Sequence, residues 1–305
     1  MMDDFEILPI EHLEPSNVLQ VINEAFSHQR TADWYRWKHI EGPWGASIGV
    51  AAVDSSGPIG VRLLLPWCFT FRGAPVLAHR ATEAATVPRA QGRGVFTALN
   101  RWMMEQVSTN LLFSTPNHKS RDGYLKLGWQ VIARSRHVWE FGPLGKPESD
   151  PMTCGSSEVP RTAWDDTALT WRADDRSGLQ YRHLPLSRRI GSASPQPENP
   201  DRPGFSSIVR YRLVRSRGVN VVFPLVGPPP EAPSGTARRL LVASRSMAMM
   251  RPESQAAYAR RHMVQAYRGE SLLVGWTPRG TSLPGAQSRT WGVAPWSAAD
   301  LEGVI

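Results

Sequence analysis

The feature that most constrains this chain is a strand that runs through a glycine-containing loop directly into a helix. Glu83 to Val87 is strand-like, two glycines follow in the loop, and an amphipathic helical pattern begins at Gly94. A helix N-terminus carries unpaired N–H groups and a partial positive charge, so a diphosphate can bind there through backbone donors. Gly92 and Gly94 have no β-carbon, which lets the main chain approach phosphate oxygens closely. The segment therefore predicts a phosphate site at a strand-to-helix junction.

The sequence leaves open whether the arginine side chains of the loop contact the phosphate. Arg89 and Arg93 can add charge-assisted hydrogen bonds to a phosphate, although Arg93 can equally point to solvent. Two other phosphate loops are excluded, because GxxxxGK[ST] is absent and Thr97 replaces the third glycine of GxGxxG. The alternative that the residues alone leave open is an ordinary strand-to-helix turn without a ligand.

Periodicity around this segment predicts a chain that mixes strands and helices. Strands are expected at residues 5–9, 48–53, 59–65, 67–71, 76–87, 111–114 and 129–141, and helices at 17–26, 34–40, 94–108 and 120–127. We expect Asp33 to cap the second helix, and Asp54 to Pro58 to form a hairpin turn.

The second half of the chain repeats this pattern weakly. Gly142 to Pro160 is rich in proline, glycine and serine, which is typical of a linker. Beyond it, strands are expected at 208–214, 219–226, 240–243 and 272–276, and a helix at 253–268. Trp171-Arg172 resembles Trp37-Lys38, so an internal duplication is one alternative that the sequence leaves open.

Composition limits the classes of partner. The net charge is +8 and comes mostly from arginine, which indicates a negatively charged partner. A phosphorylated cofactor is favoured over nucleic acid, because the arginines form no long basic run. No run of about 18 apolar residues and no apolar signal region occurs, so we expect a cytoplasmic protein without a membrane partner. Cys68 and Cys154 form no disulfide framework, and without CxxC or HExxH we expect no metal.

One motif suggests a hydrolase and is set aside. Gly45 to Gly49 matches GxSxG, which forms a nucleophile elbow when a strand precedes the serine and a helix follows it. Here Gly42-Pro43 precedes and a strand-like run follows, so an elbow is not expected. His79 and His118 are possible bases, but satisfied or exposed histidines are more common.

The phosphate loop and a second segment together resemble a known superfamily. Arg89, Gly92 and Gly94 occupy the defining positions of motif A, Q/R-x-x-G-x-G/A, of the GNAT superfamily (GCN5-related N-acetyltransferases), although Gln91 replaces a common arginine. Residues 117–129 resemble motif B, N-x-x-A-x-x-x-Y-x-K-x-G-F, with Tyr124 at the tyrosine position. The two motifs stand at the family's spacing, which makes the pair far more specific than either alone.

The resemblance covers about residues 5–141 and implies a fold and a domain plan. The fold would be α/β (α+β), with a mixed, mainly antiparallel sheet flanked by helices and a second, smaller, degenerate GNAT-like lobe. The implied domains are an acetyl-CoA-binding catalytic domain at 1–145, a linker at 146–165 and the C-terminal lobe at 166–305. The second lobe lacks Q/R-x-x-G-x-G, so we expect it not to bind the cofactor.

The resemblance also implies a reaction and its cosubstrate. GNAT enzymes pass an acetyl group from acetyl-CoA directly to an amine, here expected to be a primary amine of a small molecule such as an amino sugar. Tyr124 would donate a proton to the CoA sulfur, since a phenol with a pKa of about 10 stays protonated at neutral pH. Its alternative role is packing of a short helix.

A second catalytic residue and the cofactor contacts follow from the same resemblance. Glu83 would accept the proton of the amine, for which burial in a cleft can raise a carboxyl pKa, unless it is a structural acid paired with an arginine. The predicted cofactor contacts are Ala85, Thr86, Val87, Arg89, Gln91, Gly92, Arg93, Gly94, Val95 and Asn117. Asn117 can alternatively cap the following helix. Two further alternatives are a catalytically silent acyl-CoA-binding module and a nucleic-acid-associated protein.

Overall fold

The computed structural model describes residues 5–27, 29–107, 111–141, 161–163, 165–177, 181–185, 208–216, 219–224, 241–246 and 265–278. The chain divides into two compact units. The first consists of Met1–Arg134, Ser157–Ala163 and Ser271–Trp291, and the second of Ser135–Ser156, Trp164–Glu270 and Gly292–Ile305. The predicted linker at 146–165 lies mostly outside the described residues.

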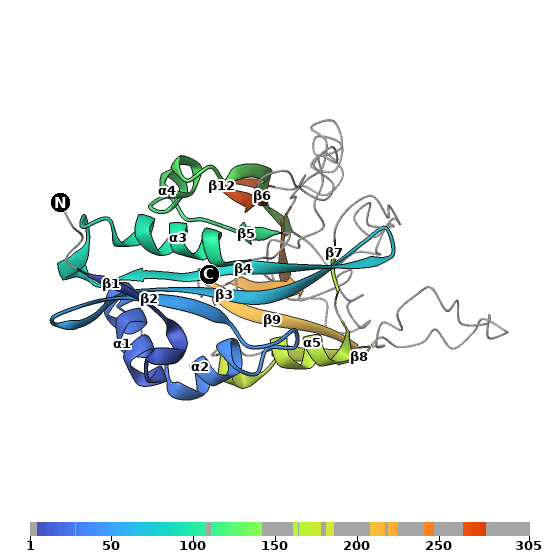
Figure 1. Ribbon diagram of the computed structural model, residues 1–305. Helices are drawn as coiled ribbons and strands as arrows, with labels where there is room; N and C mark the ends of the chain where they lie inside the picture. The colour runs from blue at the N-terminus through green and yellow to red at the C-terminus, as the bar shows by residue number, and fades with distance from the viewer. Residues whose placement is uncertain are drawn as a thin grey trace, which may run out of the picture. The chain divides into compact units, whose positions relative to one another are not determined.

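The first unit is built on a mixed, mostly antiparallel sheet (Figure 1). Its strands are β1 (Glu6–Pro9), β2 (Ile48–Asp54), β3 (Gly57–Phe71), β4 (Ala74–Thr86), β5 (Leu112–Ser114), β7 (Arg161–Thr162) and the end of β12 (Gln265–Trp276). Their order is β1-β2-β3-β4-β5-β12, and β7 lies beside β3. Only β4 and β5 run parallel among these pairs.

Helices cover both faces of this sheet. The helices are α1 (Pro15–Phe26), α2 (Ala32–His39), α3 (Val95–Gln106) and α4 (Arg121–Lys126), with 3-10 turns η1 (Ile10–His12) and η2 (Pro88–Ala90). Figure 1 shows α1 and α2 on one side of β2, β3 and β4, and α3 and α4 on the other. The mixed sheet flanked by helices confirms the predicted fold class.

The core of the first unit is aromatic and aliphatic. Trp67 packs its ring against Trp44 and Phe113, with centroids 4.9 and 5.8 Å apart, and Phe113 also contacts Phe69. The indole N–H of Trp67 donates to Thr162 Oγ1 over 3.1 Å, which holds β7 at the sheet. The described tryptophans of this core therefore pack the sheet, as large side chains with one polar atom commonly do.

The observed elements differ from the predicted ones in three places. Residues 59–65 and 67–71 form one strand, β3, because Pro66 stays in register opposite His79 and a single missing donor does not end the pairing. The cap of α2 is Thr31, whose hydroxyl accepts from Trp34 N over 3.2 Å, and the predicted cap Asp33 lies in the first turn. The helix predicted at 253–268 is wrong over 265–268, which begin β12 in extended pairing, and its remainder lies outside the described residues.

The second unit contains further β-strands. These are β8 (Tyr181–Pro185), β9 (Ile208–Ser216), β10 (Val219–Pro224), β11 (Leu241–Ser246) and the end of β6 (Gln130–Phe141). The strands predicted at 208–214 and 219–226 correspond to β9 and β10, which pair antiparallel from Ser216↔Val219 to Tyr211↔Pro224. The helix α5 (Asp166–Arg172) contains Trp171-Arg172, and the 3-10 turn η3 (Asp175–Ser177) follows it. The internal duplication stays a prediction.

Candidate active site

A bulge in β4 creates the geometry of the site. Val61 pairs with Ala85 and Leu63 with Thr82, so β4 has one residue more than β3 over this stretch. Glu83 lies in the bulge with φ of +42°, a backbone conformation that non-glycine residues seldom adopt. The extra residue redirects the side chains around Glu83, and such a conformation persists only where the surrounding contacts hold it.

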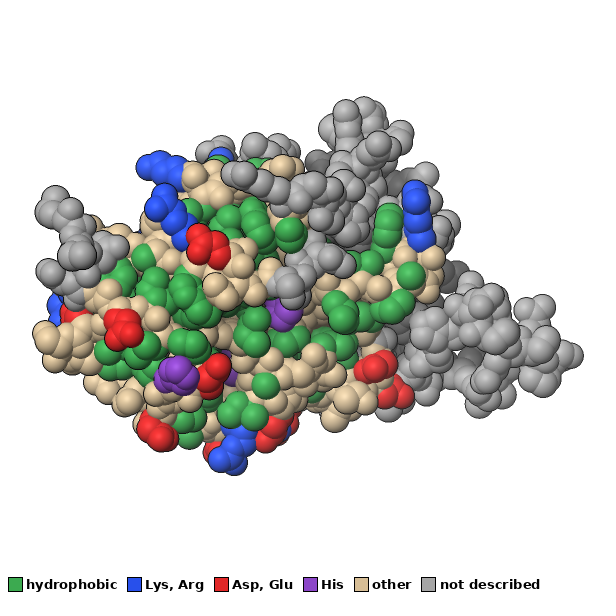
Figure 2. All heavy atoms as spheres, in the orientation of Figure 1, with side chains coloured by type: hydrophobic (Ala, Val, Ile, Leu, Met, Phe, Trp, Pro, Cys, Tyr) green, Lys and Arg blue, Asp and Glu red, His purple; other side chains and the backbone are tan. Residues whose placement is uncertain are grey.

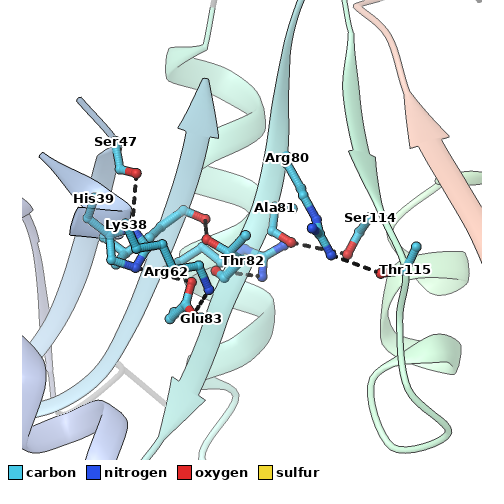
Figure 3. Close-up of polar contacts among 11 residues, drawn as sticks. Lys38, His39, Ser47, Arg62, Arg80, Ala81, Thr82, Glu83, Ser114 and Thr115 are labelled. Carbon is cyan, nitrogen blue, oxygen red and sulfur yellow. Dashed lines mark hydrogen bonds and ion pairs between the residues drawn. The ribbon is translucent and has the colours of Figure 1, made fainter. Parts of the chain in front are cut away.

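Two side chains lie against the carboxylate of Glu83. Lys38 Nζ lies 2.5 Å from Glu83 Oε1, and His39 Nε2 lies 3.4 Å from Oε2. The lysine and histidine come from the end of α2 and reach β4 across the sheet face (Figure 3). The side chains of Lys38, His39 and Glu83 are 0%, 1% and 7% exposed, so the carboxylate lies inside the protein with its counter-charges.

This setting reverses the predicted direction of the Glu83 pKa. Burial by itself raises the pKa of this carboxyl, but Lys38, His39 and hydrogen bonds from Lys38 and Thr82 lower it to about 2. The pKa of Glu83 therefore falls and does not rise, because the two neighbouring side chains and the hydrogen bonds together outweigh desolvation. In the alternative of a structural acid paired with an arginine, the partner differs, since the cation in contact with Glu83 is Lys38 of α2. Glu83 is ionised at neutral pH and can accept a hydrogen bond, but it holds a proton weakly.

Tyr124 belongs to a second cluster of buried polar side chains near the bulge. Arg62 Nη2 donates to the Tyr124 hydroxyl, and Arg62 Nη1 donates to Thr82 O over 3.3 Å. Ser114 Oγ lies 3.3 Å from the same hydroxyl and 3.2 Å from Ala81 O. The serine has a single proton, so when it donates to the Ala81 carbonyl the phenol is free to donate its own.

Arg62 is a residue of the site that the sequence prediction missed. It is buried in β3, and within the described residues no carboxylate forms an ion pair with it, while its Nε is buried without a partner. Its guanidinium lies 5.2 Å from the centre of the Tyr124 ring. The available signal was a single charged residue inside the apolar run from Ile59 to Leu65. A buried guanidinium on a phenol oxygen favours any negative charge that develops there.

The predicted phosphate loop has the expected backbone. β4 ends at Thr86, η2 follows, and α3 begins at Val95 with Gly94 as its N-cap. Gly92 and Gly94 have φ of +83° and +82°, and a β-carbon at either would meet nothing within 4 Å. No side chain caps α3. The start of α3 thus has no side-chain cap and has room beside its two glycines, as an anion site requires.

The two arginines of the loop are engaged with neighbouring elements. Arg93 Nη1 lies 2.8 Å from Asp54 Oδ2 on the β2–β3 turn. Arg89 donates to Ser56 Oγ over 3.1 Å and lies 3.5 Å from Glu24 Oε1 of α1. A hydrogen bond from Ser56, followed by that from Arg93, lowers the pKa of Asp54 to about 2. A bound diphosphate would have to compete with these oxygens for the arginines.

The end of β4 has one edge that β5 does not pair. Ala85 and Thr86 pair with β3, and Val87 N donates to Ile59 O over 2.9 Å. The parallel register of β4 with β5 reaches only Arg80↔Phe113 in the described residues. Ser114 Oγ and Arg62 Nη1 lie on the carbonyls of Ala81 and Thr82. Within the described residues the stretch of β4 after Thr82 has no strand partner on this side, and an extended arm can bind to such an edge. Gln91 Nε2 stays within the loop, 3.5 Å from Thr86 O.

Packing brings the two sequence motifs together. The Phe96 ring of α3 meets the Tyr124 ring of α4 at 5.6 Å, and a β-carbon on Gly123 would lie 2.6 Å from Phe96. Val95 packs so closely on β3 that a β-carbon at Gly60 would lie 2.5 Å from its Cγ1. Asn117 Oδ1 accepts from the N–H groups of Lys119 and Ser120 over 3.0 Å, so its oxygen shapes the turn before α4.

The described residues were also searched for metal-binding groups and for membrane-spanning helices. Those residues contain no group of three or more His, Cys, Asp or Glu side chains that could hold a metal ion. None of the helices within them is long and apolar enough to cross a membrane.

Solved structures identify the fold. The chain is similar to a GCN5-related N-acetyltransferase from Anabaena variabilis, with a TM-score of 0.60 and 9% identity over 88% of this chain and 72% of that chain. A GCN5-related N-acetyltransferase from Kribbella flavida gives a TM-score of 0.55 and 14% identity over 90% and 72%. A probable N-acyltransferase from Enterococcus faecalis gives 0.59 and 8% over 90% and 72%. The chain has the GNAT fold.

The GNAT likeness is one of structure and not of sequence. No family model matches the sequence, and no curated protein matches it. Identities of 8–14% fit a fold that is kept without close sequence similarity. Within this GNAT fold, the residues of both predicted motifs lie on α3, α4 and the loops before them.

Proposed function

We propose that this protein is a GNAT-type acyltransferase that moves an acetyl group from acetyl-CoA to a primary amine of a small molecule. One observation carries the proposal: the uncapped N-terminus of α3, with Gly92 and Gly94 at positive φ, follows directly on the strand whose edge is unpaired. The N-terminus suits the diphosphate of coenzyme A, and the edge suits its pantetheine arm. The solved N-acetyltransferases of the same fold support the reaction class.

Tyr124 and Arg62 suit the leaving group of this reaction. When the amine attacks the thioester, the carbon–sulfur bond breaks and the sulfur receives the electron pair. The Tyr124 hydroxyl is proposed to give the sulfur a proton, and Arg62 to stabilise the phenolate that remains. This assigns to Arg62 a positioning role that acts through Tyr124.

Glu83 suits the attacking amine less directly. An ionised carboxylate next to the site attracts an amine and can accept a hydrogen bond from it, but its lowered pKa makes it a weak base. We propose that Glu83 orients the amine and passes the proton on through water.

The contacts of Glu83 and Tyr124 favour a second function, a catalytically silent acyl-CoA-binding module. Glu83 is held by Lys38, and the Tyr124 hydroxyl already contacts Arg62 and Ser114. In such a module these contacts would serve only the fold.

Two measurements distinguish the proposals. Calorimetry with acetyl-CoA tests whether the α3 N-terminus binds the cofactor, and no detectable binding would refute both. Release of free CoA thiol over a panel of small primary amines, amino sugars included, tests transfer. Binding with amine-dependent thiol release supports the acyltransferase, while binding without release supports the silent module. Calorimetry with a nucleic acid tests the remaining alternative, a nucleic-acid-associated protein. On the face drawn in Figure 2, the lysine and arginine side chains lie at separate places.

A further inference from the structure

The side chain of Arg89 lies between the β2–β3 turn and α1. Arg89 belongs to η2, its Nη2 donates to Ser56 Oγ over 3.1 Å, and its Nη1 lies 3.5 Å from Glu24 Oε1. Ser56 is part of the β2–β3 turn, and Glu24 is part of α1. Figure 1 shows α1 and α3 on opposite faces of the sheet. The guanidinium of Arg89 therefore reaches away from the start of α3, where the diphosphate is proposed to bind.

Ser56 offers this guanidinium a fixed acceptor. The Ser56 hydroxyl donates to Asp54 Oδ1 over 2.6 Å, and the Ser56 N–H donates to the same oxygen over 2.9 Å. The bond from the hydroxyl is the largest of the causes that lower the pKa of Asp54 to about 2, so Asp54 is ionised and can only accept. Because its single proton is given to Asp54, the Ser56 oxygen keeps its lone pairs for Arg89.

The contact of Arg89 with Glu24 is the weaker of the two. Its atoms are 3.5 Å apart, and the side chains of Arg89 and Glu24 are 44% and 41% exposed. By comparison, Arg93 and Asp54 lie 2.8 Å apart, and the side chain of Asp54 is only 10% exposed. An exposed ion pair at such a distance contributes little and can exchange for an anion that binds more strongly. Nη1 of Arg89 can thus change its partner while Nη2 stays on Ser56.

The proposed cosubstrate carries two separate phosphate groups. Coenzyme A has a diphosphate and, on the 3′ carbon of its ribose, a phosphomonoester. The N–H groups at the start of α3 suit the diphosphate, and Arg93 directly precedes Gly94 at that place. The phosphomonoester is largely dianionic at neutral pH, and a planar guanidinium binds such a group with charge-assisted hydrogen bonds. Arg89, which precedes the glycines and reaches away from α3, suits this second phosphate.

We propose that Arg89 binds the 3′-phosphate of coenzyme A and not its diphosphate, with Ser56 as the positioning residue that holds the guanidinium. Glu24 is the partner that this phosphate displaces. The inference rests on the proposed function, because it takes the diphosphate to lie at the start of α3. It makes Arg89 a specificity residue: the site distinguishes coenzyme A from dephospho-coenzyme A, which differs only in lacking this phosphate.

The experiment measures, by calorimetry on the full-length protein, the affinities for coenzyme A and for dephospho-coenzyme A. We expect wild type to bind coenzyme A about tenfold more tightly, as hydrogen bonds between charged groups provide. Arg89→Gln keeps a donor for Ser56 and loses the charge. It should lower the affinity for coenzyme A by about tenfold and change that for dephospho-coenzyme A by less than about twofold.

Two further variants complete the test. Arg36 is an exposed arginine of α2, on the face of the sheet opposite α3. Arg36→Gln therefore loses the same charge away from the glycine loop and should keep the preference of wild type. Glu24→Gln should raise the preference for coenzyme A by about two- to fivefold, because it removes the competing carboxylate of a surface ion pair. Circular dichroism spectra that match wild type show that each variant is folded.

The outcomes separate the role of Arg89 from the proposed function. If neither ligand binds wild type, the proposed function fails and the role of Arg89 fails with it. Equal affinities of wild type for the two ligands, or an equal loss for both in Arg89→Gln, overturn the role of Arg89 and leave the diphosphate site in place. A preference that is unchanged or lower in Glu24→Gln overturns the displacement of Glu24.

Discussion

Replacing Gly94 with glutamate should remove coenzyme A binding for a reason that can be separated from stability. Gly94 has φ of +82°, so any L-residue costs about 1 to 2 kcal/mol of backbone strain. A β-carbon there meets nothing within 4 Å, so no clash adds to this cost. The side chain points into the open space proposed for the diphosphate. Two like charges about 4 Å apart repel by about 4 kcal/mol at an effective dielectric constant of about 20. We expect the affinity to fall by about 100-fold or more.

Gly73 provides the matched control. It lies at the turn between β3 and β4 with φ of +77°, and a β-carbon there also meets nothing within 4 Å. Gly73→Glu should therefore lose the same stability in urea unfolding and keep the affinity of wild type in calorimetry with CoA. If Gly94→Glu binds CoA as tightly as Gly73→Glu does, the anion site at α3 is refuted.

Further predictions address four individual side chains. Tyr124→Phe should lower kcat for amine acetylation more than it weakens CoA binding, and Arg62→Met should lower kcat by about tenfold in wild type but little in the Tyr124→Phe background. Equal effects of Arg62→Met in both backgrounds would show that it does not act through the phenol. Asp54→Ala should tighten CoA binding by about two- to fivefold in calorimetry, because it removes a competing partner of Arg93; weaker binding would contradict a diphosphate contact for that arginine. The folded pKa of His39, about 3, lies below its usual 6.5, so the unfolded chain binds more protons between these values and stability falls as pH falls. Below pH 6.5 the loss should be about 1.4 kcal/mol per pH unit and should vanish in His39→Gln; urea midpoints at pH 7 and 5 that shift equally in both proteins would contradict it.

The backbone of the phosphate loop was predictable because its signal is local. Positive φ at Gly92 and Gly94 needs residues without a β-carbon, and the helix that follows shows its own period of apolar side chains. The strands that form hairpins were predictable for the same reason, since turn residues and alternating side chains adjoin in the sequence. Over its described part, residues 265–268, the helix predicted at 253–268 failed because these residues form the start of a strand.

The setting of Glu83 was not predictable, because it depends on a bulge and on a helix far away in sequence. Lys38 and His39 meet Glu83 only after α2 packs on the face of the sheet. Their charges turn an expected rise of its pKa into a fall. Arg62 likewise became part of the site only when α4 brought Tyr124 over β3.

The sequence by itself determined most of the described elements of the first unit and the backbone of the glycine loop before α3, because backbone conformation and periodicity depend on neighbouring residues. Tertiary structure alone decided which side chains share an environment: Arg62 with Tyr124, Lys38 with Glu83, and Ser47 with His39. Charge and hydrogen bonding act through space over a few ångströms and are strongest where water is excluded. The chemistry of each group is therefore fixed by the fold that buries it.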